Sequence, residues 1–206
     1  MLAKELKYCF HVIFRPIDGF WDLKHEKRGS VKAAMIILAV ALLTFIISSR
    51  YTGFLFNPVN QLTVNLFREV AVFLAVFVLF VISNWCLTTL MDGKGTIADI
   101  AVATAYALTP YILINLPLVL LSNHITLAEA AFYNIFLVLG IIWTGGLIFL
   151  GTMVTHEYSI FRTLLTLFFV VVGMMIMVFL ALLFFSVIQR MVGLVYVIYK
   201  EITFRM

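Results

Sequence analysis

The chain has 206 residues, of which 64% are hydrophobic and only 12% are charged, and its mean hydropathy is +1.13. A soluble domain carries roughly 25% charged residues, so this composition excludes an ordinary soluble protein. The formal net charge of +4 suits an anionic lipid surface, and the basic residues form no long patch with aromatic residues, so nucleic acid is not expected as a partner.

The first 32 residues predict a cytoplasmic segment on the membrane surface. Residues 2–15 form a helix with one apolar face and one basic face, which is typical of a helix in the headgroup region. The two faces hold Leu2, Leu6, Phe10 and Ile13 against Lys4, Lys7, His11 and Arg15. We expect Pro16 to end this helix and Asp18-Gly19 to form a turn. The alternative is that the segment is a docking surface for a cytoplasmic partner.

Five apolar stretches predict five transmembrane helices in a single polytopic domain, residues 1–206. A helix crosses the bilayer core with about 20 apolar residues. The expected spans are 33–49, 70–91, 100–121, 131–152 and 163–189. The predicted fold class is therefore an all-α membrane protein with an N-terminal amphipathic interfacial helix. Residues 190–206 form an amphipathic tail that either lies on the outer surface or continues the fifth helix.

The distribution of basic residues predicts the orientation. Seven lysines and arginines precede the first span, and with five spans nine lie inside and five outside. Basic residues are enriched in cytoplasmic segments, so we expect a cytoplasmic N-terminus and a C-terminus on the outside.

The third span contains Pro110, Pro117 and Asn115, and proline kinks a helix. Two interpretations remain open: a kink buried in the bundle, or a broken helix that lines a substrate path. A path of the second kind would be indicated by a shared cavity. Its candidate lining residues are Asn84, Tyr106, Asn115 and Trp143. The third span has no acidic residue at mid-membrane, which argues against an ion-coupled pump.

The two cytoplasmic hairpins, residues 89–99 and 152–162, follow the same plan at an offset of 63 residues. In each, a threonine ends the first helix, and a hydroxyl residue, Thr96 or Ser159, is placed to cap the second helix. A charged residue, Asp99 or Arg162, then stands at the third helical position. Either the hairpins are parallel repeats or the match is due to chance.

If the hairpins are repeats, equivalent positions lie side by side. We then expect Asp99 to pair with Arg162 and Lys94 with Glu157. The hairpins would form an inner-loop surface for a partner. Its candidate binding residues are Asp92, Lys94, Asp99, His156, Glu157 and Arg162.

Catalytic interpretations of these hairpins fail on spacing. Residues 92–96 (DGKGT) have the glycines and lysine of a phosphate loop but not its spacing. His156-Glu157 begins like a zinc protease motif, but position 160, where the second histidine should stand, is isoleucine. We therefore expect no catalytic residue, no metal site and no cofactor, and hence no enzyme.

Four motifs at the span boundaries carry a resemblance to a known family. The first is PIDGFW at 16–21, and the second is Trp85 together with TLMDGKGT at 89–96. The third is YALTP at 106–110, and the fourth is Gly151 together with HEYS at 156–159. With them the chain resembles the Yip family, the Ypt/Rab-interacting membrane proteins, as a compact bacterial-type member. The resemblance implies five membrane helices, a cytoplasmic N-terminus and, here, the bacterial cytoplasmic membrane. Eukaryotic relatives act in vesicle trafficking and bind Rab GTPases and one another, whereas for compact members no activity is implied.

Two functional hypotheses follow. The first is a non-enzymatic interaction or scaffold protein, whose partners are the lipid bilayer and another membrane protein or a second copy of itself. The second is a transport component for a small molecule or lipid, with a path along the kinked third span. A cavity lined by the four residues named above would favour transport, and a packed interior would favour interaction.

Overall fold

The structure is a computed structural model that describes residues 2–57 and 65–204, and every regular element within these ranges is helical. The elements are α1 (Leu2–Phe14), α2 (Pro16–His25), α3 (Val31–Tyr51), α4 (Leu66–Leu90), α5 (Ile97–Ala107), α6 (Thr109–Ser122), η2 (Leu127–Glu129), α7 (Ala130–His156) and α8 (Ile160–Phe204). Within the part of the chain that the structure describes, five stretches are long and apolar enough to cross a membrane, with α5 and α6 together forming the third. The predicted all-α membrane fold with five candidate spans is confirmed.

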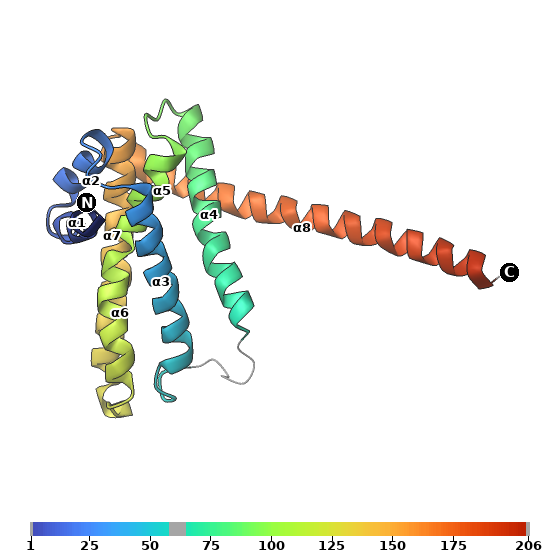
Figure 1. Cartoon of the computed structure of the whole chain (residues 1–206), viewed down its shortest axis with the longest axis horizontal. Coiled ribbons are helices and arrows are strands. Elements are labelled where there is room, and N and C mark those ends of the chain that lie inside the picture. Colours follow the sequence, from blue (N-terminus) through green and yellow to red (C-terminus); the bar gives the residue numbers. More distant parts are fainter. Residues whose placement is uncertain (1, 58–64, 205–206) are drawn as a thin grey trace.

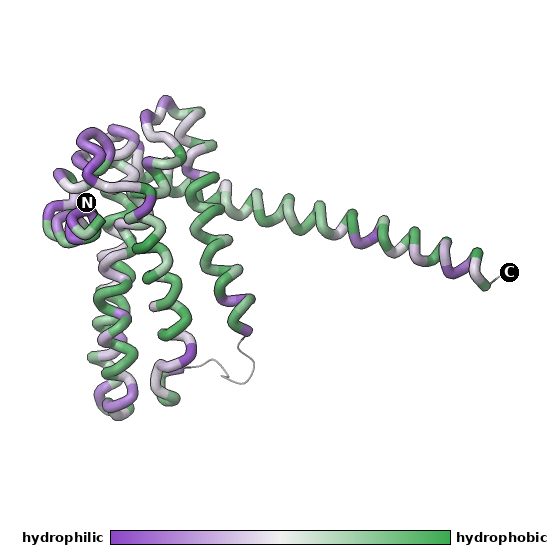
Figure 2. The backbone as a smooth tube through the Cα atoms, in the orientation of Figure 1, coloured by the Kyte–Doolittle hydropathy of each residue, from purple (hydrophilic) through white to green (hydrophobic). Residues whose placement is uncertain are grey.

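The first four spans run side by side and form a bundle (Figure 1). α6 packs against α3 and α7, and α5 packs against α3 and α7. The hairpins 91–96 and 157–159 lie at the same end of the bundle as α1 and α2, at the top of the view. Polar residues gather at this end, while the shafts of the spans are apolar (Figure 2). The N-terminal helices and both hairpins are therefore available to form one polar surface.

The fifth span, α8, leaves the bundle and runs across the direction of the other spans (Figure 1). Only its first part is packed: the Ser83 hydroxyl of α4 donates to the Val170 carbonyl oxygen at 2.8 Å, and Gly173 lies against the same serine. The helix is unbroken to Phe204, so the described part of the predicted tail continues the fifth helix, while residues 205–206 lie outside the described residues. Its long apolar surface is suited to hydrocarbon.

The third span breaks at Leu108, between α5 and α6, and Pro110 stands in the first turn of α6. Proline lacks the amide proton that would bond the carbonyl four residues earlier, which belongs to Tyr106. The Thr109 hydroxyl replaces it and donates to that carbonyl at 2.6 Å. Pro117 lies inside α6 without ending it. The broken backbone is thus bonded inside the bundle, as the buried-kink interpretation requires.

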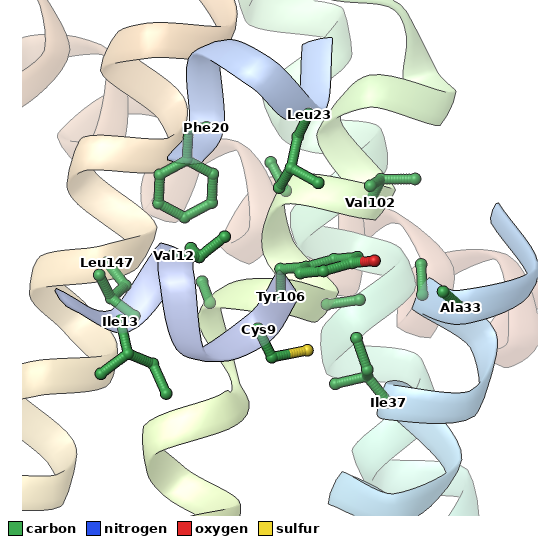
Figure 3. Packing of buried hydrophobic residues seen from close by; sticks show 14 of the residues in the cluster. Cys9, Val12, Ile13, Phe20, Leu23, Ala33, Ile37, Val102, Tyr106 and Leu147 are labelled. Carbon is green, nitrogen blue, oxygen red and sulfur yellow. The ribbon is translucent and has the colours of Figure 1, made fainter. Parts of the chain in front are cut away.

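The N-terminal helices pack onto the bundle around Tyr106 (Figure 3). Phe20 of α2 is 1% exposed, and its ring lies 3.1 Å from the place where a Cβ on Gly151 of α7 would be, so a larger residue at position 151 would push against the ring. The Tyr106 hydroxyl donates to the Glu5 carbonyl oxygen of α1 at 3.1 Å. Together these contacts hold α1 and α2 against the bundle.

One prediction for this segment is wrong, and the other is not tested. Asp18-Gly19 is not a turn but part of α2, because Gly19 approaches the Val12 backbone of α1 too closely for any side chain. The face of α1 that packs on the protein is centred on Cys9 and Val12, whereas Leu2 and Phe10 of the predicted apolar face are exposed. Contact with lipid by these exposed side chains stays a prediction.

Candidate functional site

Three segments distant in the sequence meet at the polar end of the bundle: α2, the hairpin between α4 and α5, and the hairpin between α7 and α8. We call this surface the hairpin junction. Its residues are Lys24, Met91, Asp92, Lys94, Glu157, Tyr158 and Arg162.

Glu157 is the electrostatic centre of the hairpin junction. Its two carboxylate oxygens bind Lys94 Nζ at 2.6 Å and Lys24 Nζ at 3.0 Å, and His25 Nε2 lies 3.6 Å away. The predicted Lys94–Glu157 pair is therefore confirmed, and Lys24 is an additional partner. Hydrogen bonds from Lys94 and Lys24 lower the pKa of the Glu157 carboxyl to about 2. One carboxylate thus links α2 to both hairpins.

This arrangement predicts an acid sensitivity. Because the folded-state pKa of Glu157 lies below its ordinary value of 4.5, its ionised form stabilises the folded state above about pH 4.5, and this stabilisation is lost as the pH falls toward about 2. We expect the melting temperature of the protein to fall over this range relative to a Glu157→Gln variant. Thermal unfolding of both proteins from pH 6 to pH 2 measures this difference in melting temperature. A difference in melting temperature that stays constant over this pH range would contradict the ion pairing of Glu157.

Arg162 does not pair with Asp99, and the predicted ion pair is wrong. The Arg162 guanidinium donates to the Met91 carbonyl oxygen, at the C-cap of α4, and lies 4.4 Å from the centroid of the Tyr158 ring. The Tyr158 hydroxyl donates to the same carbonyl oxygen at 2.9 Å. The helix dipole disfavours a cation at the start of α8 but favours one at the end of α4. The contact with the end of α4 therefore offsets the unfavourable interaction of Arg162 with the start of its own helix.

The Asp99 side chain forms hydrogen bonds at the start of its own helix, α5. Its carboxylate accepts from the Thr96 amide at 3.0 Å and from the Thr96 hydroxyl at 2.7 Å, while the Thr96 hydroxyl accepts from the Asp99 amide. This is the capping box that the sequence predicts. Both bonds end on Asp99 Oδ2, so the carboxylate caps the start of α5 instead of pairing with Arg162.

His156, the last residue of α7, lies beneath the junction rather than on it, at 1% exposure. The Gly95 amide donates to His156 Nδ1 at 3.4 Å. A Cβ on Gly93 or Gly95 would come within 2.8 Å of the imidazole or its neighbours, so both glycines are required for this close packing. Of the predicted inner-loop residues, Lys94 and Glu157 are therefore in direct contact, while Asp92 is exposed at the turn with φ 54°.

The two hairpins are alike only in their second halves. Thr96 and Ser159 both accept from the amide three residues on, and the following helices begin at equivalent positions. The preceding helices differ: α4 ends at Leu90, directly after Thr89, but α7 continues four residues past Thr152. The expectation that a threonine ends both helices is wrong for the second hairpin.

The four residues predicted to line a transport cavity lie in different environments. Tyr106 is fully buried in the N-terminal core, and the Asn115 side chain donates to the Tyr111 carbonyl oxygen of its own helix at 3.0 Å. Trp143 is 41% exposed on α7, and Asn84 is 1% exposed beside His156 in a small cavity. Among the described residues, no group of three or more histidine, cysteine, aspartate or glutamate side chains could hold a metal ion.

The sequence interpretation missed Lys24, Met91 and Tyr158 as parts of the junction. Tyr158 stands next to Glu157 in the HEYS motif at 156–159, and this position was the sequence feature that could have indicated its role. Met91 acts through its backbone carbonyl, which no side-chain pattern reveals. Lys24 reaches Glu157 across 133 residues of sequence, and only the packing of α2 brings them together.

Comparison with known proteins gives one family. The model of the Yip1 domain matches residues 10–183, which is most of the chain and includes α2, both hairpins and the first half of α8. No match was found among curated proteins or among solved structures.

Proposed function

The chain belongs to the Yip1 domain family, and on this premise we propose that it is a non-enzymatic membrane protein that binds another membrane protein, or a second copy of itself, through the hairpin junction. The lipid bilayer is its environment, as expected for a chain with five apolar helices. We further propose that the protein acts as a scaffold, that the hairpin junction faces the cytoplasm, and that the membrane is the bacterial cytoplasmic membrane.

The observation that carries this proposal is the three-way ion pairing of Glu157. It fixes the positions of α2 and both hairpins relative to one another, so the exposed charges beside it form a defined surface. Lys94 remains 66% exposed at its side chain although it is paired. A rigid polar surface with exposed charges can select a partner by charge complementarity.

The packing of the bundle supports interaction over transport. The carbonyl freed by Pro110 is bonded by Thr109, and Tyr106 at the break is fully buried. The residues expected to line a path are distributed among separate environments. The transport alternative therefore gains no specific observation in its favour.

Site-directed photo-crosslinking in native membranes tests the proposal. A photoreactive residue in place of Asp92, at the junction, is expected to capture a specific membrane protein or a second copy of this chain, identified by mass spectrometry. The matched probe replaces Leu127, which is 63% exposed in η2, directly before α7 and so at the end of α7 that lies away from the junction. Cysteines at the same two positions test the orientation, since a membrane-impermeant reagent on intact cells should label position 127 and not position 92.

Charge reversal supplies the matched control. Glu157→Lys places three ammonium groups together and should reduce capture from position 92 several-fold. Glu129→Lys, which changes an acidic residue at the opposite end, should leave capture unchanged. Equal capture from both ends, or capture indifferent to Glu157→Lys, would reject the junction as the binding surface.

A further inference from the structure

A small cavity lies directly beneath the hairpin junction, enclosed by α4, α5 and α7. Its volume of about 10 Å³ is close to that needed to hold one water molecule. Its polar lining residues are Asn84 of α4, Thr104 of α5, and Thr152, Thr155 and His156 of α7. A cavity of this size with so polar a lining is unlike the dry apolar cavities found in protein cores.

Two buried polar atoms in this lining lack a partner. Asn84 Oδ1 and His156 Nε2 are both inaccessible to solvent, and neither has a hydrogen-bond partner among the residues that the structure describes. Each residue is only 1% exposed. Buried polar side-chain atoms nearly always find a partner, so two unpaired atoms in one cavity indicate a shared ligand.

The hydrogen bond on the other side of the imidazole defines what that ligand must do. The Gly95 amide donates to His156 Nδ1, so Nδ1 is an acceptor and the proton of the neutral ring is on Nε2. His156 Nε2–H therefore needs an acceptor, while Asn84 Oδ1 needs a donor. A molecule that accepts on one side and donates on the other satisfies both.

The threonines supply a further acceptor. The hydroxyls of Thr104 and Thr152 donate to the carbonyl oxygens of Ile100 and Ile148, at 2.7 Å and 2.8 Å, within their own helices. Each hydroxyl oxygen thus keeps its lone pairs for another donor. A water molecule at this place can accept one hydrogen bond and donate two, which matches the usual three bonds of a buried water.

We propose that the cavity is a binding site for a single water molecule that accepts from His156 Nε2–H and donates to Asn84 Oδ1 and to one threonine hydroxyl. The water connects the end of α7 to the middle of the bundle, and it holds the imidazole against Gly95 from below. The site is independent of any partner bound at the junction.

Nuclear magnetic resonance of protein labelled with ¹⁵N-histidine, in lipid bilayers, tests this directly. Replacement of His11, His25 and His124 by glutamine leaves His156 as the single signal. We expect the neutral tautomer with the proton on Nε2, and magnetisation transfer from a bound water to that proton. A proton on Nδ1, or an Nε2–H without transfer from water, would overturn the proposal.

Variants at the acceptor side provide the second measurement. Asn84→Leu removes the acceptor and fills the cavity, so the transfer from water should be lost, whereas Asn84→Asp keeps an acceptor and should retain it. Asn134→Leu, at an exposed asparagine of α7, is the control and should leave the signal unchanged. Persistence of the transfer in Asn84→Leu would overturn the site. If that variant does not fold, the tautomer and transfer in the parent protein decide the question alone.

Discussion

Replacement of Phe20 by alanine is expected to lower the free energy of unfolding by about 3–5 kcal/mol and to loosen the N-terminal helices from the bundle. The Phe20 ring is 1% exposed and lies in the space left by Gly151 of α7. It also belongs to the cluster that surrounds Tyr106 (Figure 3). Alanine would leave a cavity at the place where α2 contacts α7, and the other buried large side chain of α2 is Leu23.

Trp21→Ala is the matched control for this prediction. Trp21 is the adjacent and larger aromatic residue, but it is 48% exposed and stacks on His25. Loss of the Trp21 side chain should lower the free energy of unfolding by no more than about 1 kcal/mol. Denaturant unfolding in detergent micelles measures both variants, and trypsin cleavage after Lys27 or Arg28 reports release of the segment. Equal destabilisation by the two substitutions, or unchanged cleavage in Phe20→Ala, would contradict the role of Phe20 as the anchor.

The spans could be predicted from the sequence because they depend on local composition. A membrane helix must bond its own backbone and face hydrocarbon, so an uninterrupted apolar stretch such as 70–91 is nearly sufficient evidence. The N-terminal segment could not be predicted in this way. Asp18-Gly19 has the local signal of a turn, but the close contact between Gly19 and Val12 makes glycine useful inside a helix.

The hairpin junction was predictable only in part, for a similar reason. Alignment of the hairpins brought Lys94 opposite Glu157 because the helices that follow begin at equivalent positions. The same alignment failed for Asp99, whose carboxylate is used by its own capping box. Sequence spacing shows which residues are near one another, but it does not show which of several nearby partners a charge takes.

The contact of Arg162 leads to the second large expected effect. Arg162→Ala should lower the free energy of unfolding by about 1.5–3 kcal/mol, because the Met91 carbonyl oxygen loses a charged donor. Arg190→Ala, an exposed arginine of the same helix, is the control and should change stability by no more than about 0.5 kcal/mol. Chemical denaturation in detergent micelles measures both.

Double-mutant cycles then distinguish the observed partner of Arg162 from the expected one. Arg162 and Tyr158 share the Met91 carbonyl and stack on each other, so Arg162→Ala combined with Tyr158→Leu should show a coupling energy of at least about 0.5 kcal/mol. Asp99→Ala removes only the cap of α5 and should lower the free energy of unfolding by about 1 kcal/mol. Its effect should add to that of Arg162→Ala within about 0.5 kcal/mol. Coupling to Asp99 without coupling to Tyr158 would mean that Arg162 joins the hairpins through α5 instead of closing the end of α4.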